Sequence, residues 1–323
     1  MMDSPVLFMT GLGRYLDRAE NLKVLYDAYK GEKVFRSMYE PGAVNEAMSG
    51  KYDVLVIDIF PTFTTGKTIM IWHAIQGGKL IGLGQKGTYY KPEMAQNINW
   101  IVAAGRGGKE MFHQCTGVDR DRILPLGMPR TDRYIGKRKG DGGTVLAEKK
   151  AYLYVPTFRG KMDPPFPEID WDYIDRQLRD DEVLAVKPHP YGQKFNLDCC
   201  RHIIELSNME PSVNYLIDCD VVITDYSSIM FDGYLLGKPA VLFEKKPGYL
   251  QTRGMYMQYP DKYCSRYATD ESDLLWKVRS ADGLTKTELD CMEYVAGCCD
   301  GHSIERIIKL IKEVQECRGS FVI

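Results

Sequence analysis

The 323-residue sequence lacks a hydrophobic run long enough to cross a bilayer. A spanning helix needs about 18 consecutive apolar residues or more, whereas the longest candidates here, such as Val54–Ile59 and Ile69–Trp72, have the length of a strand. The first residues, Met1-Met2-Asp3-Ser4-Pro5, lack the basic region and cleavage pattern of a signal peptide. These absences predict a soluble protein without a membrane span or a secretion signal.

The sequence also has little net charge and no cysteine pattern of a known kind. Its 42 Lys and Arg residues nearly balance 44 Asp and Glu, for a formal charge of -2, so we predict no nucleic-acid partner. The nine cysteines are odd in number and include no C-x-x-C, which favours a reducing, cytoplasmic location. No cluster of His, Cys, Asp and Glu has the spacing of a zinc site, and we expect neither a metal nor another cofactor.

The apolar content, 44% of the residues, is enough for real cores, and the length is typical of two domains. Short β-branched runs alternate with helical patterns, which predicts an α/β fold with parallel sheets. Strands are expected at Val6–Thr10, Val54–Phe60, Thr68–Trp72, Trp100–Ala104, Ala151–Pro156, Glu182–Lys187, Asp220–Thr224 and Ala240–Phe243. Helices are expected at Leu16–Tyr29, Asp172–Arg179, Ser228–Leu236, Lys286–Ala296 and Ser303–Glu316.

The segment Gly136–Gly143 contains four glycines and alternating charge, a composition typical of a flexible hinge. We therefore predict two Rossmann-like domains, residues 1–140 and residues 141–323, with the last helix packing back on the first domain. In such folds a ligand binds beyond the carboxyl ends of the strands, and we expect the site in a cleft between the domains.

Two glycine motifs are misleading. Gly66-Lys67-Thr68 resembles the end of a phosphate-binding loop, but Pro61 stands where that loop needs glycine, and a strand follows instead of a helix. The run from Gly82 to Gly87 satisfies G-x-G-x-x-G, yet no acidic residue follows at the spacing that dinucleotide binding requires. We interpret the first as a turn and the second as a tight backbone bend beside a ligand.

Polar side chains suited to anionic chemistry follow several of the expected strands. His73 ends the strand Thr68–Trp72, where a neutral imidazole could take a proton from a substrate hydroxyl or could simply cap the strand. Arg159 ends another strand, and its planar fork of donors matches a phosphate, although pairing with a nearby carboxylate is equally compatible. His189 lies between Pro188 and Pro190, which fix its position before any ligand arrives.

A further strand runs into Thr224, and Ser227 and Ser228 follow at a helix start. Helix N-termini offer unpaired N–H groups, and two hydroxyls add donors for a phosphate, although a simple Ser N-cap remains an alternative. Weaker candidates are the lysines Lys79 and Lys187 and the pair Arg130 and Asp132, which could line the cleft.

Taken in order, these motifs resemble the CDP-glycerol glycerophosphotransferase family, which builds teichoic acids and capsular polyol-phosphate polymers in bacteria. The matching pieces are Trp72-His73 through Lys79 and Gly82, Gly127-x-Pro129-Arg130-x-Asp132, Pro156-Thr157-Phe158-Arg159, Lys187-Pro188-His189-Pro190, Thr224-Asp225-Tyr226-Ser227-Ser228, Lys238-Pro239 and Tyr249. Unlike the best-known polymerases, the chain has no proline in the segment Ala74–Lys79 that follows Trp72-His73, and no long N-terminal extension.

The resemblance implies a GT-B architecture, a metal-independent site and a CDP-glycerol or CDP-ribitol donor. It implies that His73 is the base for the acceptor hydroxyl and that Arg159, His189, Ser227 and Ser228 hold the donor pyrophosphate. We add Lys187 and Thr224 to the expected donor side, and Lys79, Arg130 and Asp132 to the acceptor side or cleft. The acceptor hydroxyl would attack the β-phosphate and displace CMP, with a protonated His189 stabilising the departing phosphate.

Two other functions remain open from the residues alone. A GT-B glycosyltransferase could bind its nucleotide-sugar diphosphate at the same helix start, and a catalytically inactive protein could bind the nucleotide or the polymer. A lipid-linked saccharide or polyol-phosphate acceptor would place the protein peripherally on the inner face of the bacterial membrane. The cluster of Arg130, Arg133, Lys137, Arg138 and Lys139 could meet anionic head groups there, or could be a solvated hinge.

Overall fold

The computed structural model describes residues 5–12, 20–63, 65–79, 92–159, 163–189, 192, 195–207, 211–245, 248–250 and 254–316. These residues form two compact units. Unit 1 contains the described residues of 1–76, 81–133 and 294–323, and unit 2 contains those of 77–80 and 134–293. The C-terminal helix thus belongs to the same unit as most of the first 133 residues, and the main part of unit 2 begins at Tyr134.

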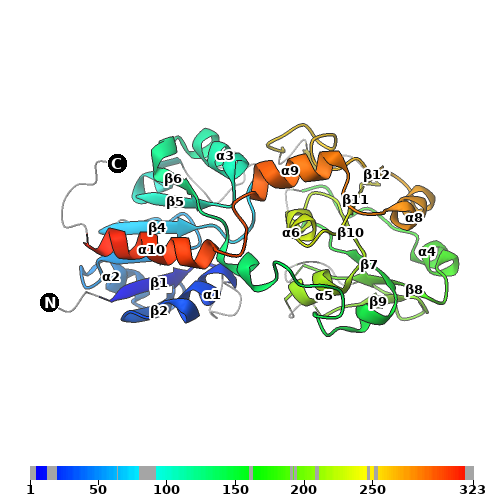
Figure 1. Cartoon of the computed structure of the whole chain (residues 1–323), viewed down its shortest axis with the longest axis horizontal. Helices are drawn as coiled ribbons and strands as arrows, with labels where there is room; N and C mark the ends of the chain where they lie inside the picture. Colours follow the sequence, from blue (N-terminus) through cyan, green and yellow to red (C-terminus); the bar gives the residue numbers. More distant parts are fainter. Residues whose placement is uncertain are drawn as a thin grey trace. The chain divides into compact units, whose positions relative to one another are not determined.

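Unit 1 is built on a parallel six-stranded sheet with the order β2-β1-β3-β4-β5-β6 (Figure 1). Its strands are β1 Val6–Thr10, β2 Lys33–Ser37, β3 Val54–Ile57, β4 Lys67–Ile71, β5 Trp100–Ala103 and β6 Ile123–Pro125. The strands β1, β3 and β5 are buried along their whole length. This burial agrees with their continuous apolar sequences, because helices cover both faces of a parallel sheet.

The helices of unit 1 are α1 Glu20–Ala28, α2 Ala43–Met48, α3 Arg106–Thr116 and α10 Ser303–Glu316, with short 3-10 turns η2 Pro92–Asn97, η3 Arg120–Arg122 and η4 Pro129–Arg133. Helix α10 packs against α1 and β3 (Figure 1). It buries Ile307, Leu310, Ile311 and Val314 on one face, at the spacing of successive helical turns. The first residues of the helix expected at Leu16–Tyr29 lie outside the described residues.

Unit 2 contains a second parallel six-stranded sheet, with the order β12-β11-β10-β7-β8-β9. Its strands are β7 Lys150–Tyr154, β8 Glu182–Val186, β9 Ile203–Glu205, β10 Val221–Thr224, β11 Ala240–Phe243 and β12 Tyr267–Ala268. One core cluster joins the centre of this sheet to its helices and includes Tyr154, Ile174, Val186 and Ile223. The predicted α/β class with two parallel sheets is therefore confirmed.

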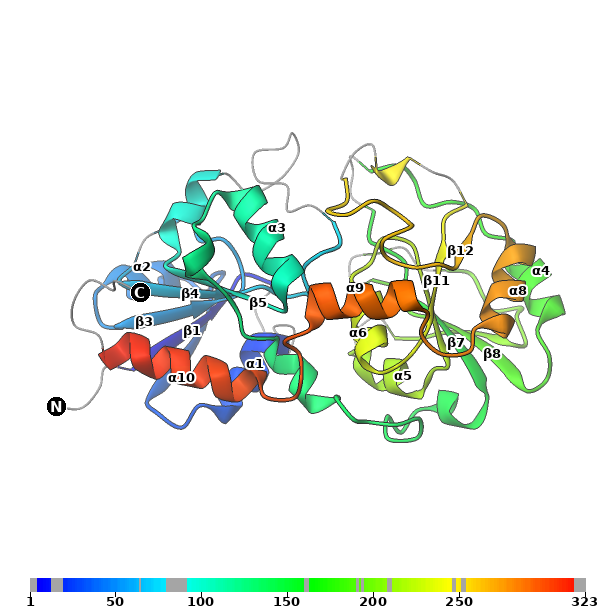
Figure 2. The same cartoon turned by 45° about the horizontal axis from the view of Figure 1, so that its top comes forward.

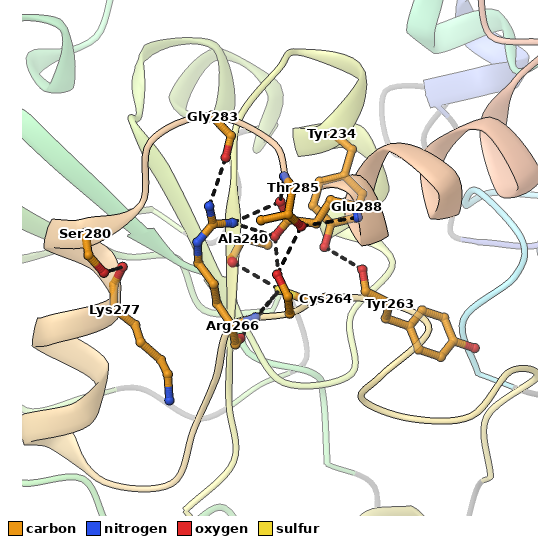
Figure 3. Close-up of polar contacts among 11 residues, drawn as sticks. Tyr234, Ala240, Tyr263, Cys264, Arg266, Lys277, Ser280, Gly283, Thr285 and Glu288 are labelled. Atoms are coloured by element: carbon orange, nitrogen blue, oxygen red, sulfur yellow. Dashed lines mark hydrogen bonds and ion pairs between the residues drawn. The ribbon is translucent and has the colours of Figure 1, made fainter.

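The helices of unit 2 are α4 Trp171–Gln177, α5 Val213–Asp218, α6 Ile229–Leu235, α8 Glu271–Ser280 and most of α9 Lys286–Ala296, with the 3-10 turn η5 Val145–Glu148. Helix α8 contacts β11, β12 and α4 (Figure 2). Helix α9 is fixed by a buried polar cluster, in which the Arg266 guanidinium pairs with the Glu288 carboxylate (Figure 3). Glu288 also accepts hydrogen bonds from the Thr285 N–H and the Cys264 thiol.

The glycine-rich segment expected to be a flexible hinge is held against unit 2 by one carboxylate. Asp218, at the end of α5, is fully buried and accepts hydrogen bonds from the N–H groups of Gly140, Gly142 and Thr144 at 2.8–3.0 Å. It also accepts one from the Thr144 hydroxyl at 2.8 Å. Burial is the largest single influence on the pKa of Asp218 and raises it. The hydrogen bonds together outweigh burial, so the pKa lies below its ordinary value. The segment is thus part of unit 2 in this structure.

The remaining sequence features are the two glycine motifs and the question of a membrane-spanning helix. Lys67 begins β4, so Gly66-Lys67-Thr68 is the turn into a strand that the sequence predicted. The run Gly82–Gly87 lies outside the described residues. In the part of the chain that the structure describes, no helix combines the length and the apolar character needed to cross a membrane.

Candidate active site

The topology of unit 2 creates a switch point between β7 and β10. The chain leaves β7 toward β8 and β9 on one side, then returns to β10 and continues to β11 and β12 on the other. In open α/β sheets, ligands bind at the carboxyl ends of the two strands that flank such a point. Here these ends carry Pro156–Arg159 after β7 and Asp225–Ser228 after β10, two of the segments that the sequence singled out.

Arg159 and Asp225 form a nearly buried ion pair at the switch point. The Arg159 Nη2 lies 2.6 Å from Asp225 Oδ2, and the two side chains are 14% and 4% exposed. The other carboxylate oxygen accepts the N–H groups of Thr157 at 2.8 Å and Tyr226 at 2.6 Å. The carboxylate pairing left open by the sequence is therefore present. It fixes one nitrogen of a guanidinium that has five N–H donors, which orients the fork.

Aromatic rings enclose the same guanidinium. The Arg159 Cζ lies 4.4 Å from the ring centroid of Tyr249, 5.7 Å from that of Tyr226 and 6.0 Å from that of Phe166. The rings of Tyr226 and Tyr249 stack at 4.6 Å with an interplanar angle of 19°. Cations are attracted to ring faces at these distances, so the aromatic wall and Asp225 together restrict Arg159 to one arrangement.

His189 lies just beyond β8 and lines a pocket with Arg159. The pocket has a volume of about 100 Å³ and is lined by Pro156, Thr157, Phe158, Arg159, Phe166, His189, Gly192 and Phe195. The imidazole packs against the ring of Phe158 at 5.1 Å between centroids. Burial, reinforced by the charges of Lys79 and Lys187, lowers the pKa of His189 to about 4. Without a ligand His189 is therefore neutral at pH 7, and the expected protonated form requires a nearby anion.

The two lysines that act on His189 also belong to unit 2. Lys187 is 2% exposed, and its ammonium donates a hydrogen bond of 2.7 Å to the Ser207 carbonyl. Lys79 forms an isolated antiparallel bridge with Met255, and its Nζ lies 5.9 Å from the ring centroid of Tyr249. The structure thus brings together Arg159, His189, Lys79 and Lys187, four of the predicted site residues.

The three hydroxyl residues at and after the end of β10, which were predicted to bind the donor, have different surroundings. Thr224 is fully buried, and its hydroxyl donates a 2.6 Å hydrogen bond to the Val155 carbonyl, which ties β10 to the end of β7. The Ser227 hydroxyl accepts a long hydrogen bond of 3.4 Å from the Ile229 N–H. Ser228 occupies the N-cap position of α6, but its side chain does not cap the helix. Donor binding by these three residues stays a prediction.

His73 lies beyond β4 in unit 1, where its backbone is held on both sides. The Asn21 side-chain amide donates a 2.9 Å hydrogen bond to the Trp72 carbonyl, and the Arg130 guanidinium donates one of 3.0 Å to the His73 carbonyl. Asn21 also accepts the Arg130 N–H at 3.0 Å, which closes the network. The His73 ring packs on Trp72, with 4.5 Å between centroids. Arg130 therefore positions the backbone of His73.

Asp132 holds a helix in this structure. Its carboxylate accepts the Ile304 N–H at 2.7 Å, in the first turn of α10. The Arg130 Nη1 lies 3.7 Å from the Glu20 Oε2, and a role of Arg130 in lining a cleft stays a prediction. A role of Asp132 toward an acceptor stays a prediction.

Three residues of these networks had no predicted role: Asn21, Asp225 and Tyr249. The only sequence signal for Asn21 is a polar residue on the apolar face of a predicted helix, where it is 2% exposed.

Among the described residues no group of three or more His, Cys, Asp or Glu side chains could hold a metal ion. The absence of a cofactor stays a prediction.

Comparison with known proteins identifies the family of the chain. The family model described as CDP-Glycerol:Poly(glycerophosphate) glycerophosphotransferase matches residues 37–313. The chain is 25% identical over 269 residues to a teichoic acid poly(ribitol-phosphate) polymerase of Bacillus spizizenii, covering 77% of this chain and 43% of that protein. It is 26% identical over 266 residues to a teichoic acid glycerol-phosphate primase of Bacillus subtilis, covering 77% of this chain and 68% of that protein.

A solved structure shares the fold. A variant of the wall teichoic acid polymerase TagF, soaked with CDPG, superimposes with a TM-score of 0.72 at 18% identity, covering 97% of this chain and 89% of that chain. The predicted GT-B type, with two Rossmann-like α/β units, is therefore confirmed. The chain spans less than half the length of the Bacillus spizizenii polymerase.

Proposed function

Because the chain belongs to the CDP-glycerol:poly(glycerophosphate) glycerophosphotransferase family, we propose that it transfers a polyol phosphate from a CDP-activated donor to an acceptor hydroxyl in teichoic acid synthesis. Glycerol phosphate is the first candidate for the transferred group and ribitol phosphate the second. The observation that carries the proposal is the pocket at the switch point of unit 2, where Arg159 and His189 line one small cavity.

The donor diphosphate fits the charges of this pocket. Arg159 is a permanent cation whose orientation is fixed by Asp225, and such a preorganised donor costs little reorganisation when a phosphate binds. A diphosphate beside His189 raises the pKa of the imidazole above its ligand-free value of about 4, since a nearby opposite charge favours the protonated form. Proton uptake on donor binding would give His189 the charge needed to stabilise departing CMP.

The chemical step is an in-line displacement at phosphorus. His73 takes the proton of the acceptor hydroxyl, whose oxygen forms a bond to the β-phosphorus of the donor. The bond from that phosphorus to the bridging oxygen breaks, and CMP leaves with the electron pair. Asn21 and Arg130 support this role because they hold the carbonyls of Trp72 and His73, and a fixed base is worth more than a mobile one.

We further propose a lipid-linked saccharide or polyol-phosphate acceptor, which would bring the protein to the inner face of the membrane. Lys137 and Arg138 are exposed and suited to anionic head groups. Lys139 forms an ion pair within unit 2, in which its Nζ lies 2.7 Å from the Asp220 Oδ2. Sedimentation with vesicles that contain or lack anionic lipid tests this part, and equal partitioning would remove the membrane proposal.

The direct test is release of CMP from CDP-glycerol and CDP-ribitol by wild type, His73→Ala, His189→Ala and a control, His202→Ala. His202 is a histidine of unit 2 that does not line the pocket. We expect wild type and control to be active and both site variants to lose about 100-fold or more, as for a general acid or base. His73→Ala should still bind the donor, whereas His189→Ala should bind it more weakly. Full activity in both site variants would refute the assignment, turnover of a nucleotide-sugar would indicate a glycosyltransferase, and donor binding without turnover would indicate a binding protein.

A further inference from the structure

Tyr249 contacts two cations of the candidate site, yet no role follows for it from the sequence. The residue lies beyond β11 and is 3% exposed. The Arg159 Cζ is 4.4 Å from its ring centroid, and the Lys79 Nζ is 5.9 Å from it. Both distances fall within the roughly 6 Å over which a ring face attracts a cation.

The ring of Tyr249 is itself held in place by two further rings. Tyr226 is fully buried and stacks on Tyr249 at 4.6 Å, while Tyr259 packs against Tyr226 at 5.0 Å. The Tyr259 hydroxyl donates a 3.2 Å hydrogen bond to the Asp225 carbonyl. The aromatic stack is therefore tied to the same residue that orients Arg159, and the position of the Tyr249 face is set by the fold.

We propose that Tyr249 is a positioning residue, whose ring holds Arg159 and Lys79 where they meet the diphosphate of the donor. Two like charges near one pocket repel each other, and attraction of both cations to one aromatic ring offsets part of that repulsion while restricting both side chains. The proposal rests on the proposed function, because it assigns the two cations to the donor. It makes Tyr249 responsible for donor affinity and leaves the chemistry to His73 and His189.

A second consequence follows from the charge of Lys79. Lys79 is the larger of the two charges that lower the pKa of His189. If the ring of Tyr249 is removed and Lys79 moves away, the pKa of His189 should rise toward its ordinary value. A residue that merely fills the core would change neither the donor affinity nor this titration.

The test compares two substitutions of Tyr249 with one control. Tyr249→Phe keeps the ring face, whereas Tyr249→Leu removes it but remains apolar. Tyr234→Leu is the matched control, since Tyr234 is a ring of the same size in unit 2, 1% exposed. Folding is checked by thermal melting, and the readouts are the Kd for CDP and CDP-glycerol, the donor KM, kcat and the His189 titration by NMR.

We expect Tyr249→Phe to stay within about twofold of wild type in Kd and KM, because the ring face is kept. Tyr249→Leu should raise Kd and KM by about 5- to 30-fold with kcat changed less than threefold, and should raise the His189 pKa. Tyr234→Leu should lower the Tm without a change in donor Kd. An unchanged Kd in folded Tyr249→Leu, or an equal rise in Tyr234→Leu, would overturn the proposal.

Failure of the proposed function gives a different result. A wild type that binds CDP but releases no CMP from CDP-glycerol would refute the transfer reaction. The Kd comparison for CDP would then still decide whether Tyr249 positions the two cations.

Discussion

At the scale of single residues, Asp225 determines the orientation of the Arg159 guanidinium. An arginine side chain has many rotamers, and holding it in one of them costs conformational entropy. Asp225 meets that cost with a carboxylate that is itself fixed by the N–H groups of Thr157 and Tyr226. Under the proposed function, the ion pair is therefore compatible with phosphate binding, because it orients the guanidinium of Arg159.

We predict that Asp225→Asn weakens both stability and donor binding. The substitution leaves the Arg159 guanidinium nearly buried without its counter-charge, a change that costs about 3 kcal/mol or more for a buried pair. Donor KM should rise about tenfold, because Arg159 loses its fixed orientation. Asp261→Asn is the control, since this exposed carboxylate in unit 2 contacts the Gln258 amide at 3.3 Å. An unchanged KM in folded Asp225→Asn would contradict the positioning role.

At the scale of elements, the strands that the sequence predicted are those inside the sheets. All eight expected strands are present, with ends that differ by at most three residues. The four strands without a sequence prediction, β2, β6, β9 and β12, are the edges of the two sheets. An inner strand is buried on both faces and reads as an apolar run. The edge strand β2 contains Lys33 and Arg36 and is fully buried only at Ser37, and β6 and β9 have three residues each. β12 contains only two residues, too few for any periodicity.

The same distinction applies to the candidate site. Residues that follow inner strands, such as Arg159 and His189, could be predicted because parallel strands place their carboxyl ends at one edge. The partners that reach the site from distant segments of the chain could not be predicted in this way. Arg130 meets the carbonyl of a residue 57 positions away, and Asp132 meets an N–H 172 positions away. These contacts depend on how helices pack, and nothing local in the sequence specifies them.

The attachment of α9 to the rest of unit 2 depends on one buried ion pair, so breaking that pair should destabilise the fold. The Arg266 Nη1 lies 2.8 Å and 2.9 Å from the two oxygens of Glu288, whose side chain is fully buried (Figure 3). Glu288→Gln should lower the free energy of unfolding by about 3 kcal/mol, because the guanidinium keeps its charge without a partner. The measurement is urea unfolding monitored by circular dichroism.

Two further variants make that test specific. Asp290→Asn breaks the exposed Lys286–Asp290 pair of the same helix, at 3.2 Å, and should change stability by less than about 0.5 kcal/mol. The double variant Arg266→Met with Glu288→Met should recover much of the loss, since an apolar pair of similar volume can replace a buried ion pair. A loss of the same size in Asp290→Asn would show that the Arg266–Glu288 pair has no special role.

At the scale of the whole molecule, two groups with opposite pKa shifts lie in separate units. Asp58 follows β3 at the switch point of the unit 1 sheet, between β3 and β1, and is 1% exposed. Burial raises its pKa to about 6, against the opposing hydrogen bonds from the Thr10 hydroxyl at 2.6 Å and the Gly11 N–H at 2.9 Å. His189 in unit 2 has its pKa lowered to about 4.

These shifts act on stability in opposite directions. Asp58 binds its proton more tightly in the folded chain, so its contribution is present below pH 3.8 and is lost as the pH rises through about 6. The lost contribution is up to about 3 kcal/mol between these two pKa values. His189 releases its proton more readily in the folded chain, so its contribution is present above pH 6.5 and is lost as the pH falls toward 4.

We therefore predict that the two contributions partly cancel between pH 4 and pH 6.5, the window set by these pKa values. The stability of Asp58→Asn relative to wild type should rise with pH across this window, because the variant has no buried carboxyl to ionise. The stability of His189→Asn relative to wild type should fall, since wild type alone gains from the neutral imidazole. Calorimetry at several pH values measures both differences. If the units unfold in separate transitions, each difference should appear in the transition of its own unit, and slopes of the same sign would contradict the assignment.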